Sequence, residues 1–483
     1  MSFVVGEHGK ASRVAATEAV VVGGGHAGML AVQALLGHVG KITVVERDRY
    51  PDAPVFRAGV PQARHLHGLA YGGQRALENL LPGIVPALMA AGARLVVPPR
   101  DVVIHTASGW HHRFGFTRFP TVSCTRPLLD FVVRTRVLAE AAGSATQVEV
   151  LEGTEVTGLV GASDRATGAR VRSRGADQPE RELSADLVVD ASGRGSRAPK
   201  WFEALGLSAP AEEIVDAQLA YATRLYRFPV EPDDGVLLQP EPQLRRGGVL
   251  MPVEDGRWLV TLSGFTGIRP PTDEDMFLDY TATLAHPHLH RVLKAAEPLS
   301  PVYGFLDTSN RYRHYERRGA APDSFVAVGD ALASFNPVYG QGMTAGALHA
   351  VALRDAVAKV GLRRGLSASA QRAIARASAM PWRTATAVDR AYLKAAATEA
   401  GNAASASMPE RLSQWFNERL IGHATTNERV AEVVHGVFQL ALPPTRLLSP
   451  AVVLRILLMS PVPGHAEPPA HVFEARRGHL PTP

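Results

Sequence analysis

The feature that most constrains this chain is a pair of glycine-rich segments about 300 residues apart. The first contains Gly23, Gly25 and Gly28 in the spacing G-x-G-x-x-G. Loops that bind a dinucleotide use this spacing, since the glycines permit a tight turn, a close approach to pyrophosphate and packing of a helix on a strand. The second segment begins at Gly329 and Asp330. Either loop alone is weak evidence, but the pair indicates one extended ligand held at both ends.

The residues around the first segment predict a β-α-β unit. Residues 19–22 form a short apolar strand, residues 28–36 a helix of small and aliphatic side chains, and residues 41–45 a second strand. Glu46 follows that strand, where a carboxylate accepts hydrogen bonds from adenosine ribose hydroxyls. The helix N-terminus offers amide donors and partial positive charge to phosphates. A glycine-rich turn in an unrelated α/β protein is the alternative interpretation.

The second segment follows a strand predicted at residues 325–328 and continues into Asn336-Pro337-Val338-Tyr339-Gly340-Gln341-Gly342-Met343. It resembles the ribityl- and flavin-binding segment of FAD-dependent monooxygenases. The resemblance implies that Asp330 accepts hydrogen bonds from ribityl hydroxyls. Gly340 and Gly342 would let the backbone lie against the isoalloxazine edge, and the helix that starts there would stabilise negative charge on reduced flavin.

With both segments in place, residues 19–350 resemble class A-type FAD monooxygenases related to squalene epoxidase and phenol hydroxylases. More narrowly, they resemble bacterial polyether epoxidases that act on the polyene precursors of monensin and lasalocid. That likeness depends on residues 59–65, 109–110, 221–225, 252–258 and 336–340, and it departs from the epoxidases at Gln341, where we expect His. No W-x-W-x-I-P segment occurs, which disfavours tryptophan halogenases. The cofactor-binding residues that the resemblance implies are Gly23, Gly25, His26, Ala27, Gly28, Glu46, Arg47, Arg57, Arg126, Asp330, Pro337, Gly340, Gly342 and Met343.

Some of these assignments have ordinary alternatives. Arg57 and Arg126 match arginines that contact the flavin cofactor in the family, but both could be surface arginines. Asp190 resembles the start of an Asp-Gly motif that supports flavin and nicotinamide binding, yet two residues intervene before Gly193. A plain turn after a core strand explains that loop equally well.

The resemblance implies an α/β fold of the p-hydroxybenzoate hydroxylase type. A Rossmann-like FAD-binding domain is expected at residues 15–210 and 315–365, with part of residues 65–125 contributing to the substrate domain. The substrate domain is an antiparallel β-sheet at residues 211–314, where alternating apolar residues and a turn at 254–256 predict paired strands. Residues 366–483 are expected to form a C-terminal helical region, since they contain long alanine-rich stretches. Within the first domain, residues 126–142 are expected to form a long helix, and the alternation over residues 148–160 predicts a strand pair entering a turn.

For the reaction, the resemblance implies epoxidation of an alkene in a polyketide or terpenoid intermediate through a C4a-hydroperoxyflavin. Such a reaction needs an apolar pocket that excludes water, but no protein base. Candidate wall residues are Trp110, Met251 and Phe265, each of which could instead belong to the core. No catalytic residue is identified, because His65 and His67 could be catalytic or could simply pack and form hydrogen bonds.

Only one dinucleotide fingerprint is present, so NAD(P)H would either bind transiently or act through a separate flavin reductase. A different class remains open, in which the protein is a Diels-Alderase-like cyclase of a polyketide pathway and FAD is structural. A flavin-dependent reductase of isolated alkenes is a third possibility.

Composition narrows the partners further. The 483 residues carry a net charge of +5 with scattered arginines, so we expect no nucleic-acid partner. No run of eighteen apolar residues occurs, and we expect no stable membrane insertion. Cys124 is the single cysteine, which excludes an internal disulfide framework and fits the reducing cytoplasm. Histidine clusters such as residues 286–290 lack the spacing and acidic partners of a metal site, so we expect no metal.

Overall fold

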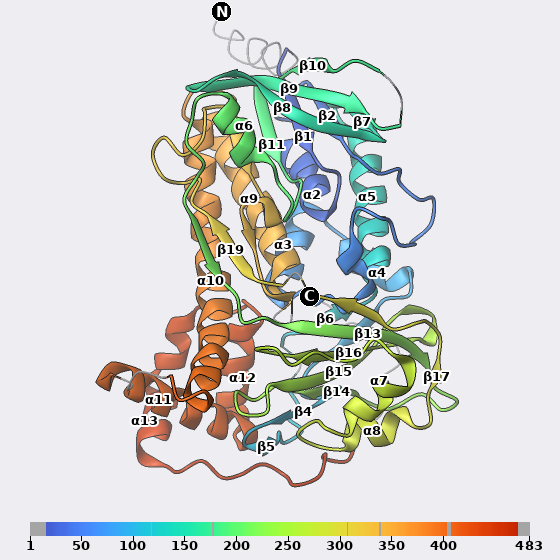
Figure 1. The fold of residues 1–483 in the computed structure, drawn as a ribbon, viewed down its shortest axis with the longest axis vertical. Coiled ribbons are helices and arrows are strands. Elements are labelled where there is room, and N and C mark those ends of the chain that lie inside the picture. The colour runs from blue at the N-terminus through green and yellow to red at the C-terminus, as the bar shows by residue number, and fades with distance from the viewer. Residues whose placement is uncertain are drawn as a thin grey trace, which may run out of the picture.

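The computed structural model describes residues 16–116, 118–175, 178–306, 308–337, 340–402 and 407–471. Two lobes make up the molecule, and the long helix α10 (Leu366–Glu399) runs along both (Figure 1). The predicted Val338 and Tyr339 of the second segment, residue 15 and residues 472–483 lie outside the described residues.

The upper lobe contains a five-stranded parallel sheet in the order β20–β11–β1–β2–β7. Except for the edge strand β7, its strands are short and mostly apolar, as strands covered on both faces must be. Their bounds are β1 (Glu18–Val22), β2 (Lys41–Val45), β7 (Gln147–Leu151), β11 (Leu187–Asp190) and β20 (Phe325–Ala327). Because β20 lies beside β11, and β11 beside β1, the strand before the second glycine segment joins the sheet that carries the first.

Helices cover this sheet, and a second sheet packs near its upper end (Figure 1). Helix α5 begins as predicted, with the Thr125 side chain accepting a hydrogen bond from the backbone of Leu128. The helices of the lobe are α2 (His26–Leu35), α3 (Tyr71–Leu80), α4 (Ile84–Ala90), α5 (Arg126–Ala142), α6 (Ala198–Ala204) and α9 (Gln341–Val360). The second sheet has the order β10–β9–β8, from β8 (Thr154–Ala162), β9 (Arg165–Ser173) and β10 (Arg181–Ser184).

Residues 148–160 form two strands that do not pair with each other. The alternation over residues 148–160 predicted a strand pair joined by a turn. The turn exists at Gly153, but β7 pairs with β2 in the parallel sheet whereas β8 pairs with β9. Alternation therefore identified both strands, while their partners lie elsewhere in the sequence.

The lower lobe is built on an eight-stranded, mostly antiparallel sheet in the order β17–β13–β16–β15–β14–β4–β5, with β18 also pairing with β13. Its inward side chains form a separate apolar core that helices α7 (Glu274–Thr281) and α8 (His288–Leu293) cover. The strands are β4 (Val102–Thr106), β5 (Gly109–Trp110), β13 (Ala220–Arg227), β14 (Gly235–Leu238), β15 (Arg246–Pro252), β16 (Trp258–Gly264), β17 (Glu297–Pro298) and β18 (Tyr303–Phe305).

Smaller elements connect the lobes. One short sheet contains β12 (Glu212–Val215), β19 (Asn310–Arg313) and β21 (Ala333–Ser334). Another contains β3 (Arg94–Val96) and β6 (Thr121–Ser123). On α10, the buried Asp389 accepts hydrogen bonds from the side-chain amides of Asn310 and Asn336. Further along α10, the Tyr392 ring stacks on Phe265, with ring centroids 4.0 Å apart.

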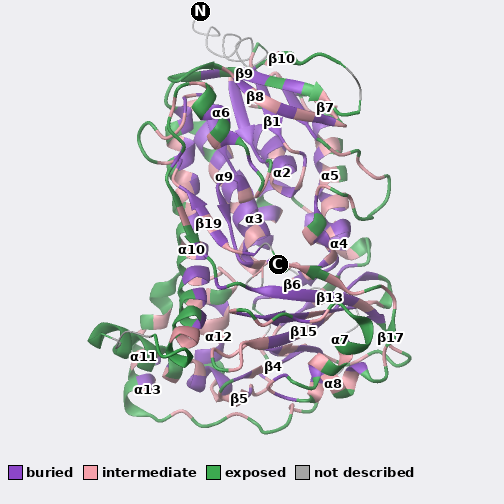
Figure 2. Cartoon of the chain, viewed as in Figure 1, coloured by how far each residue is buried: buried purple, intermediate pink, exposed green. Residues whose placement is uncertain are grey.

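The C-terminal region is helical, with α11 (Met408–Thr426), α12 (Glu428–Phe438) and α13 (Pro450–Leu458) packed beside the lower sheet. Figure 2 shows buried strands at the centre of each lobe and exposed residues along α11. Among the described residues, none of the helices combines the length and apolar character needed to cross a bilayer.

Candidate cofactor-binding site

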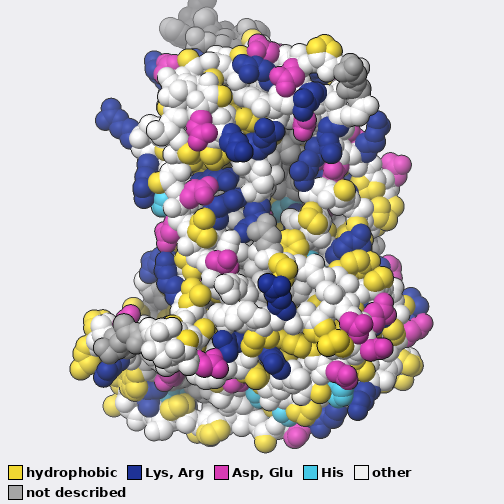
Figure 3. Space-filling view, in the orientation of Figure 1, with side chains coloured by type: hydrophobic (Ala, Val, Ile, Leu, Met, Phe, Trp, Pro, Cys, Tyr) yellow, Lys and Arg dark blue, Asp and Glu magenta, His cyan; other side chains and the backbone are white. Residues whose placement is uncertain are grey.

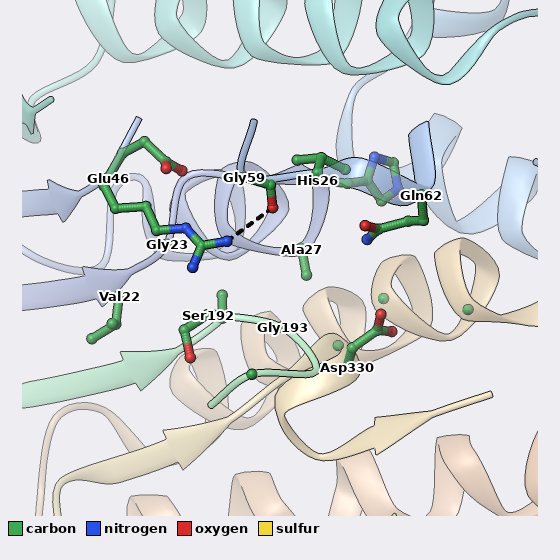
Figure 4. A pocket seen from close by; sticks show the side chains of 18 of the residues that line it. Val22, Gly23, His26, Ala27, Glu46, Gly59, Gln62, Ser192, Gly193 and Asp330 are labelled. Atoms are coloured by element: carbon green, nitrogen blue, oxygen red, sulfur yellow. Dashed lines mark hydrogen bonds between the residues drawn. The ribbon is translucent and has the colours of Figure 1, made fainter. Parts of the chain in front are cut away.

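A cavity of about 1520 Å³, including its mouth, lies in the upper lobe where the two glycine segments meet (Figure 4). The residues that line it come from both segments, as an extended dinucleotide held at both ends requires. Of the fourteen residues predicted to bind cofactor, all but Gly28 line it: Gly23, Gly25, His26, Ala27, Glu46, Arg47, Arg57, Arg126, Asp330, Pro337, Gly340, Gly342 and Met343.

The first glycine segment forms the turn that its spacing predicted. Gly23 has φ +90°, and a Cβ there would lie 2.8 Å from the carbonyl oxygen of Ala191. Gly28 faces away from the cavity, since a Cβ on it would lie 1.9 Å from the Gly23 carbonyl oxygen. Gly28 therefore lets α2 pack against the turn. No side chain caps the N-terminus of α2, so its first backbone amides remain available to an anionic ligand.

Glu46 sits at the end of β2 and is buried. Its Oε2 accepts a hydrogen bond from the Gly24 amide at 2.8 Å and pairs with Arg57 Nη1 at 3.1 Å. Burial alone would lower the pKa of Arg57, but the Glu46 carboxylate outweighs it and the pKa is raised. The carboxylate is thus held in place, with Arg57 beside it, where an adenosine ribose would lie. Arg47 donates to the Gly59 carbonyl at 3.1 Å across the same wall (Figure 4).

His26 is the first residue of α2 and is only 5% exposed. Neither of its ring nitrogens has a hydrogen-bond partner among the described residues, although Asp130 Oδ1 lies 3.8 Å from Nδ1. Burial and then the Arg126 guanidinium lower the pKa of His26 to about 4. The cavity wall therefore carries a neutral imidazole whose hydrogen-bonding capacity is unused.

The second segment turns at Gly329, where φ is +58° and a Cβ would lie 2.7 Å from the Ala27 Cβ. The two segments thus meet within van der Waals distance, although they are about 300 residues apart in sequence. Asp330 points into the cavity, and among the described residues its carboxylate has no hydrogen-bond partner (Figure 4). Burial raises the pKa of Asp330, while the Arg126 guanidinium acts in the opposite direction. An unpaired acceptor in this position suits the hydroxyls of a ribityl chain.

Helix α9 starts at Gln341, and its N-cap Gly340 has φ +63°. Gly340 lies against Gly68, since a Cβ on Gly340 would be 3.2 Å from the Gly68 Cα. Both glycines line the cavity, together with Met343. This end has close backbone contact, a helix N-terminus and apolar side chains, which is a suitable environment for a flat ring that becomes negatively charged.

Several residues of the site were not predicted as cofactor ligands. Residues 59–68 line the cavity through Gly59, Val60, Gln62, His67 and Gly68. In the sequence, residues 59–65 stand out only as part of the resemblance to the polyether epoxidases. Nothing local indicates that this loop reaches back to Gly340.

Two buried side chains support the loops from behind. Asp190 accepts hydrogen bonds from the Ser192 and Ser196 hydroxyls at 2.6 Å and 2.5 Å, which holds the turn that carries Ser192 and Gly193 into the cavity. His349 on α9 accepts a hydrogen bond from the Gly329 amide at 3.0 Å, and its other nitrogen lies 2.7 Å from the Ser378 hydroxyl. A lone histidine in an alanine-rich helix carries no sequence signal for such a role.

The three residues predicted as substrate-pocket walls do not line this cavity. Trp110 is fully buried in the lower lobe, with its ring edge-on to His286 and His288. Phe265 is fully buried against Tyr392 of α10. Met251 lies on β15, half-buried. Trp110 and Phe265 thus have the core role that was their alternative interpretation.

The donors and acceptors along the cavity fit FAD in order. Arg57 and Glu46 lie at one end, the amides of α2 follow, Asp330 comes next, and the N-terminus of α9 ends the series. No group of three or more His, Cys, Asp or Glu side chains in the described parts of the chain is arranged to hold a metal ion.

Comparison with known proteins agrees with this geometry. A family model described as "FAD binding domain" matches residues 16–387. Protein Rv3254 of Mycobacterium tuberculosis is 33% identical over 380 residues, which cover 75% of this chain and 78% of that protein. Kynurenine 3-monooxygenase of Salinispora tropica is 28% identical over 335 residues, covering 67% and 69%. The structure of the flavin-dependent brominase Bmp2 superimposes with a TM-score of 0.64 at 15% identity, covering 88% and 94%.

Proposed function

Because the chain belongs to the family with this FAD binding domain and is an FAD-dependent monooxygenase, we propose that it epoxidises an alkene of a polyketide or terpenoid intermediate. One atom of dioxygen becomes the epoxide oxygen and the other leaves as water. The two electrons required come from NAD(P)H. FAD, when bound, supplies the oxygen activation, and the protein must orient the alkene and exclude water.

The observation that carries the proposal is the scarcity of a usable base at the ring end of the cavity. Apolar side chains from Val60, Phe335 and Met343 line the cavity. His67 is one of the two histidines that line the cavity. Its Nδ1 donates to the His65 carbonyl at 2.9 Å, which leaves Nε2 as the unprotonated nitrogen. Burial, followed by the Arg126 guanidinium, lowers the pKa of His67 to about 3.

Hydroxylation of a phenol profits from removal of the phenolic proton, and a base with so low a pKa is poorly matched to a phenol. No tyrosine or cysteine of the described residues lines the cavity to take that role instead. Epoxidation of an alkene needs no proton removed from the substrate. The residues around the expected ring position therefore favour an alkene over a phenol.

A redox-neutral cyclase is the second candidate, and the Asp190 loop favours it. In the resembled motif the aspartate supports nicotinamide binding, whereas Asp190 is fully buried and satisfied by Ser192 and Ser196. Direct use of NAD(P)H would then need other groups. The epoxidase proposal accordingly includes a separate flavin reductase as an alternative source of electrons.

We place the reaction in the reducing cytoplasm, in keeping with the single, buried and unpaired Cys124.

The deciding experiment uses the purified, FAD-loaded chain with a panel of polyene substrates. With NADPH or a flavin reductase under isotopically labelled dioxygen, we expect one labelled oxygen atom in the product. Conversion without oxygen or reductant would refute the epoxidase and support the cyclase. Conversion with reductant but without oxygen would instead identify an alkene reductase.

A further inference from the structure

The exposed hydrophobic side chains of this protein are concentrated at its C-terminal end. Ten of the seventeen large exposed hydrophobic side chains in the described residues lie between 408 and 462. Seven of them form what we call the C-terminal platform: Met408, Leu412 and Trp415 of α11, and Leu454, Leu457, Leu458 and Met459 of α13 and its end. Scattered exposed apolar residues need no explanation, but a gathered set indicates a contact surface.

Both helices present these side chains as stripes. On α11, Met408, Leu412 and Trp415 are spaced by four and three residues, so they share one face. On α13, Leu454, Leu457 and Leu458 face away from Val452 and Ile456, which are buried. Figure 3 shows hydrophobic side chains at the left-hand edge, where Figure 1 places α11.

Arg419 joins the two stripes into one surface. It follows Trp415 by four residues on α11, and its guanidinium carbon lies 5.2 Å from the centroid of the Trp415 ring. The same guanidinium donates to the backbone carbonyls of Ile456, at 2.7 Å, and of Met459. The end of α13 is therefore fixed next to Trp415, and a cation lies between the stripes.

The charge around the α13 half of the platform is one-sided. Residues 433–466 contain Arg446 and Arg455 but neither Asp nor Glu. On α11, Glu410 is two residues from Met408 and from Leu412, which places it on the opposite side of the helix, whereas the exposed Glu418 lies three residues after Trp415, beside the stripe. Apolar stripes with a tryptophan and cations at their margin suit the interface of an anionic bilayer, where arginine can reach lipid phosphates.

We propose that the C-terminal platform binds the surface of anionic phospholipid membranes, without crossing them. A second copy of the chain fits the platform less well. In a two-fold contact that sets α13 against α13 of a second copy, the arginines of residues 433–466 would meet a segment that has no carboxylate. Phospholipid phosphates supply the missing negative charge. This inference does not depend on the proposed reaction.

The test is co-sedimentation of the full chain with vesicles of equimolar phosphatidylcholine and phosphatidylglycerol. We expect binding that weakens with added salt and is lower on phosphatidylcholine alone. The double substitution Leu457→Glu with Leu458→Glu should reduce binding by at least about tenfold, since it places two charges in the apolar contact. Arg446→Glu should reduce binding only to the anionic vesicles.

Met276→Glu is the matched control, because Met276 is 59% exposed on α7 of the lower lobe, outside the platform. It should leave vesicle binding unchanged. Bound vesicles should also shift tryptophan emission to shorter wavelength, and Trp415→Phe should remove that shift. The proposal is overturned if the wild-type chain stays in the supernatant with both vesicle types. It is equally overturned if the wild-type chain has twice its mass of 51.6 kDa in solution and the Leu457/Leu458 variant becomes monomeric.

Discussion

The contact between Ala27 and Gly329 offers a direct test of how the two glycine segments meet. Substituting Gly329→Ala places a Cβ 2.7 Å from the Ala27 Cβ and imposes a side chain on a residue with φ +58°. The left-handed conformation costs about 1–2 kcal/mol for a residue with a Cβ. The steric overlap adds about 1–3 kcal/mol, as overpacking of a well-packed interior usually does. The expected loss of unfolding free energy is their sum, about 2–5 kcal/mol.

The second substitution, Ala27→Gly, removes the overlap but leaves the backbone strain. Alone it costs up to about 1 kcal/mol, because glycine is a weaker helix former. The double variant should therefore be more stable than the two single effects predict, by about 1–3 kcal/mol. Urea unfolding gives the four free energies of the cycle, and fluorescence titration with FAD gives the four affinities.

Gly193→Ala is the matched control, because Gly193 has φ +81° but a Cβ added there would have no neighbouring atom within 4 Å. Ala27→Gly should not rescue that variant. If the effects of Ala27→Gly and Gly329→Ala add to within about 0.5 kcal/mol, the two segments do not meet as described, and the assignment of one cavity to both fails.

Three further predictions concern the same site. Asp330→Ala should weaken FAD binding by about tenfold or more in calorimetric titrations, since a charged acceptor is lost, without lowering stability in urea. Gly28→Ala should lower the free energy of unfolding by about 3 kcal/mol, since its Cβ would lie 1.9 Å from a backbone oxygen. Burial lowers the pKa of His349 to about 3, so between about pH 6.5 and pH 3 this histidine is protonated in the unfolded chain but neutral in the folded chain. Stability should therefore fall as the pH drops below about 6.5, by up to about 1.4 kcal/mol per pH unit from this residue, and His349→Gln should remove that contribution in unfolding curves between pH 7 and pH 5.

Elements with a strong local signal were predicted well from the sequence. The strand at residues 41–45 and the helix at residues 126–142 have the predicted bounds. A short apolar run and a long helical pattern can both be recognised from the local sequence alone. The fold class and the identification as an FAD-dependent monooxygenase are confirmed. The specific link to polyether epoxidases stays a prediction.

What the sequence left undetermined depends on distant contacts. β7 and β8 were expected to pair with each other, but β7 pairs with β2 and β8 pairs with β9. An apolar residue such as Trp110 can cover a substrate or fill a core, and only the packing of β5 against α8 decides between the two. His349 supports Gly329 from twenty residues away along the chain, a distance at which no periodic pattern connects a helix with a turn.

The position of β20 in the parallel sheet has a consequence for synthesis in the cell. About 300 residues separate β1 from β20, and the glycine segments that follow these two strands line the same cavity. At translation rates of about 5–20 residues per second, the ribosome needs roughly 15–60 s to deliver the later strand after the earlier one. Strand β11 emerges about 135 residues before β20, and from then on the nascent chain exposes one apolar edge of β11 and half of a nucleotide pocket. Yield of the yellow holoprotein should therefore depend on chaperone supply during elongation, and on coenzyme supply only after the late strand emerges.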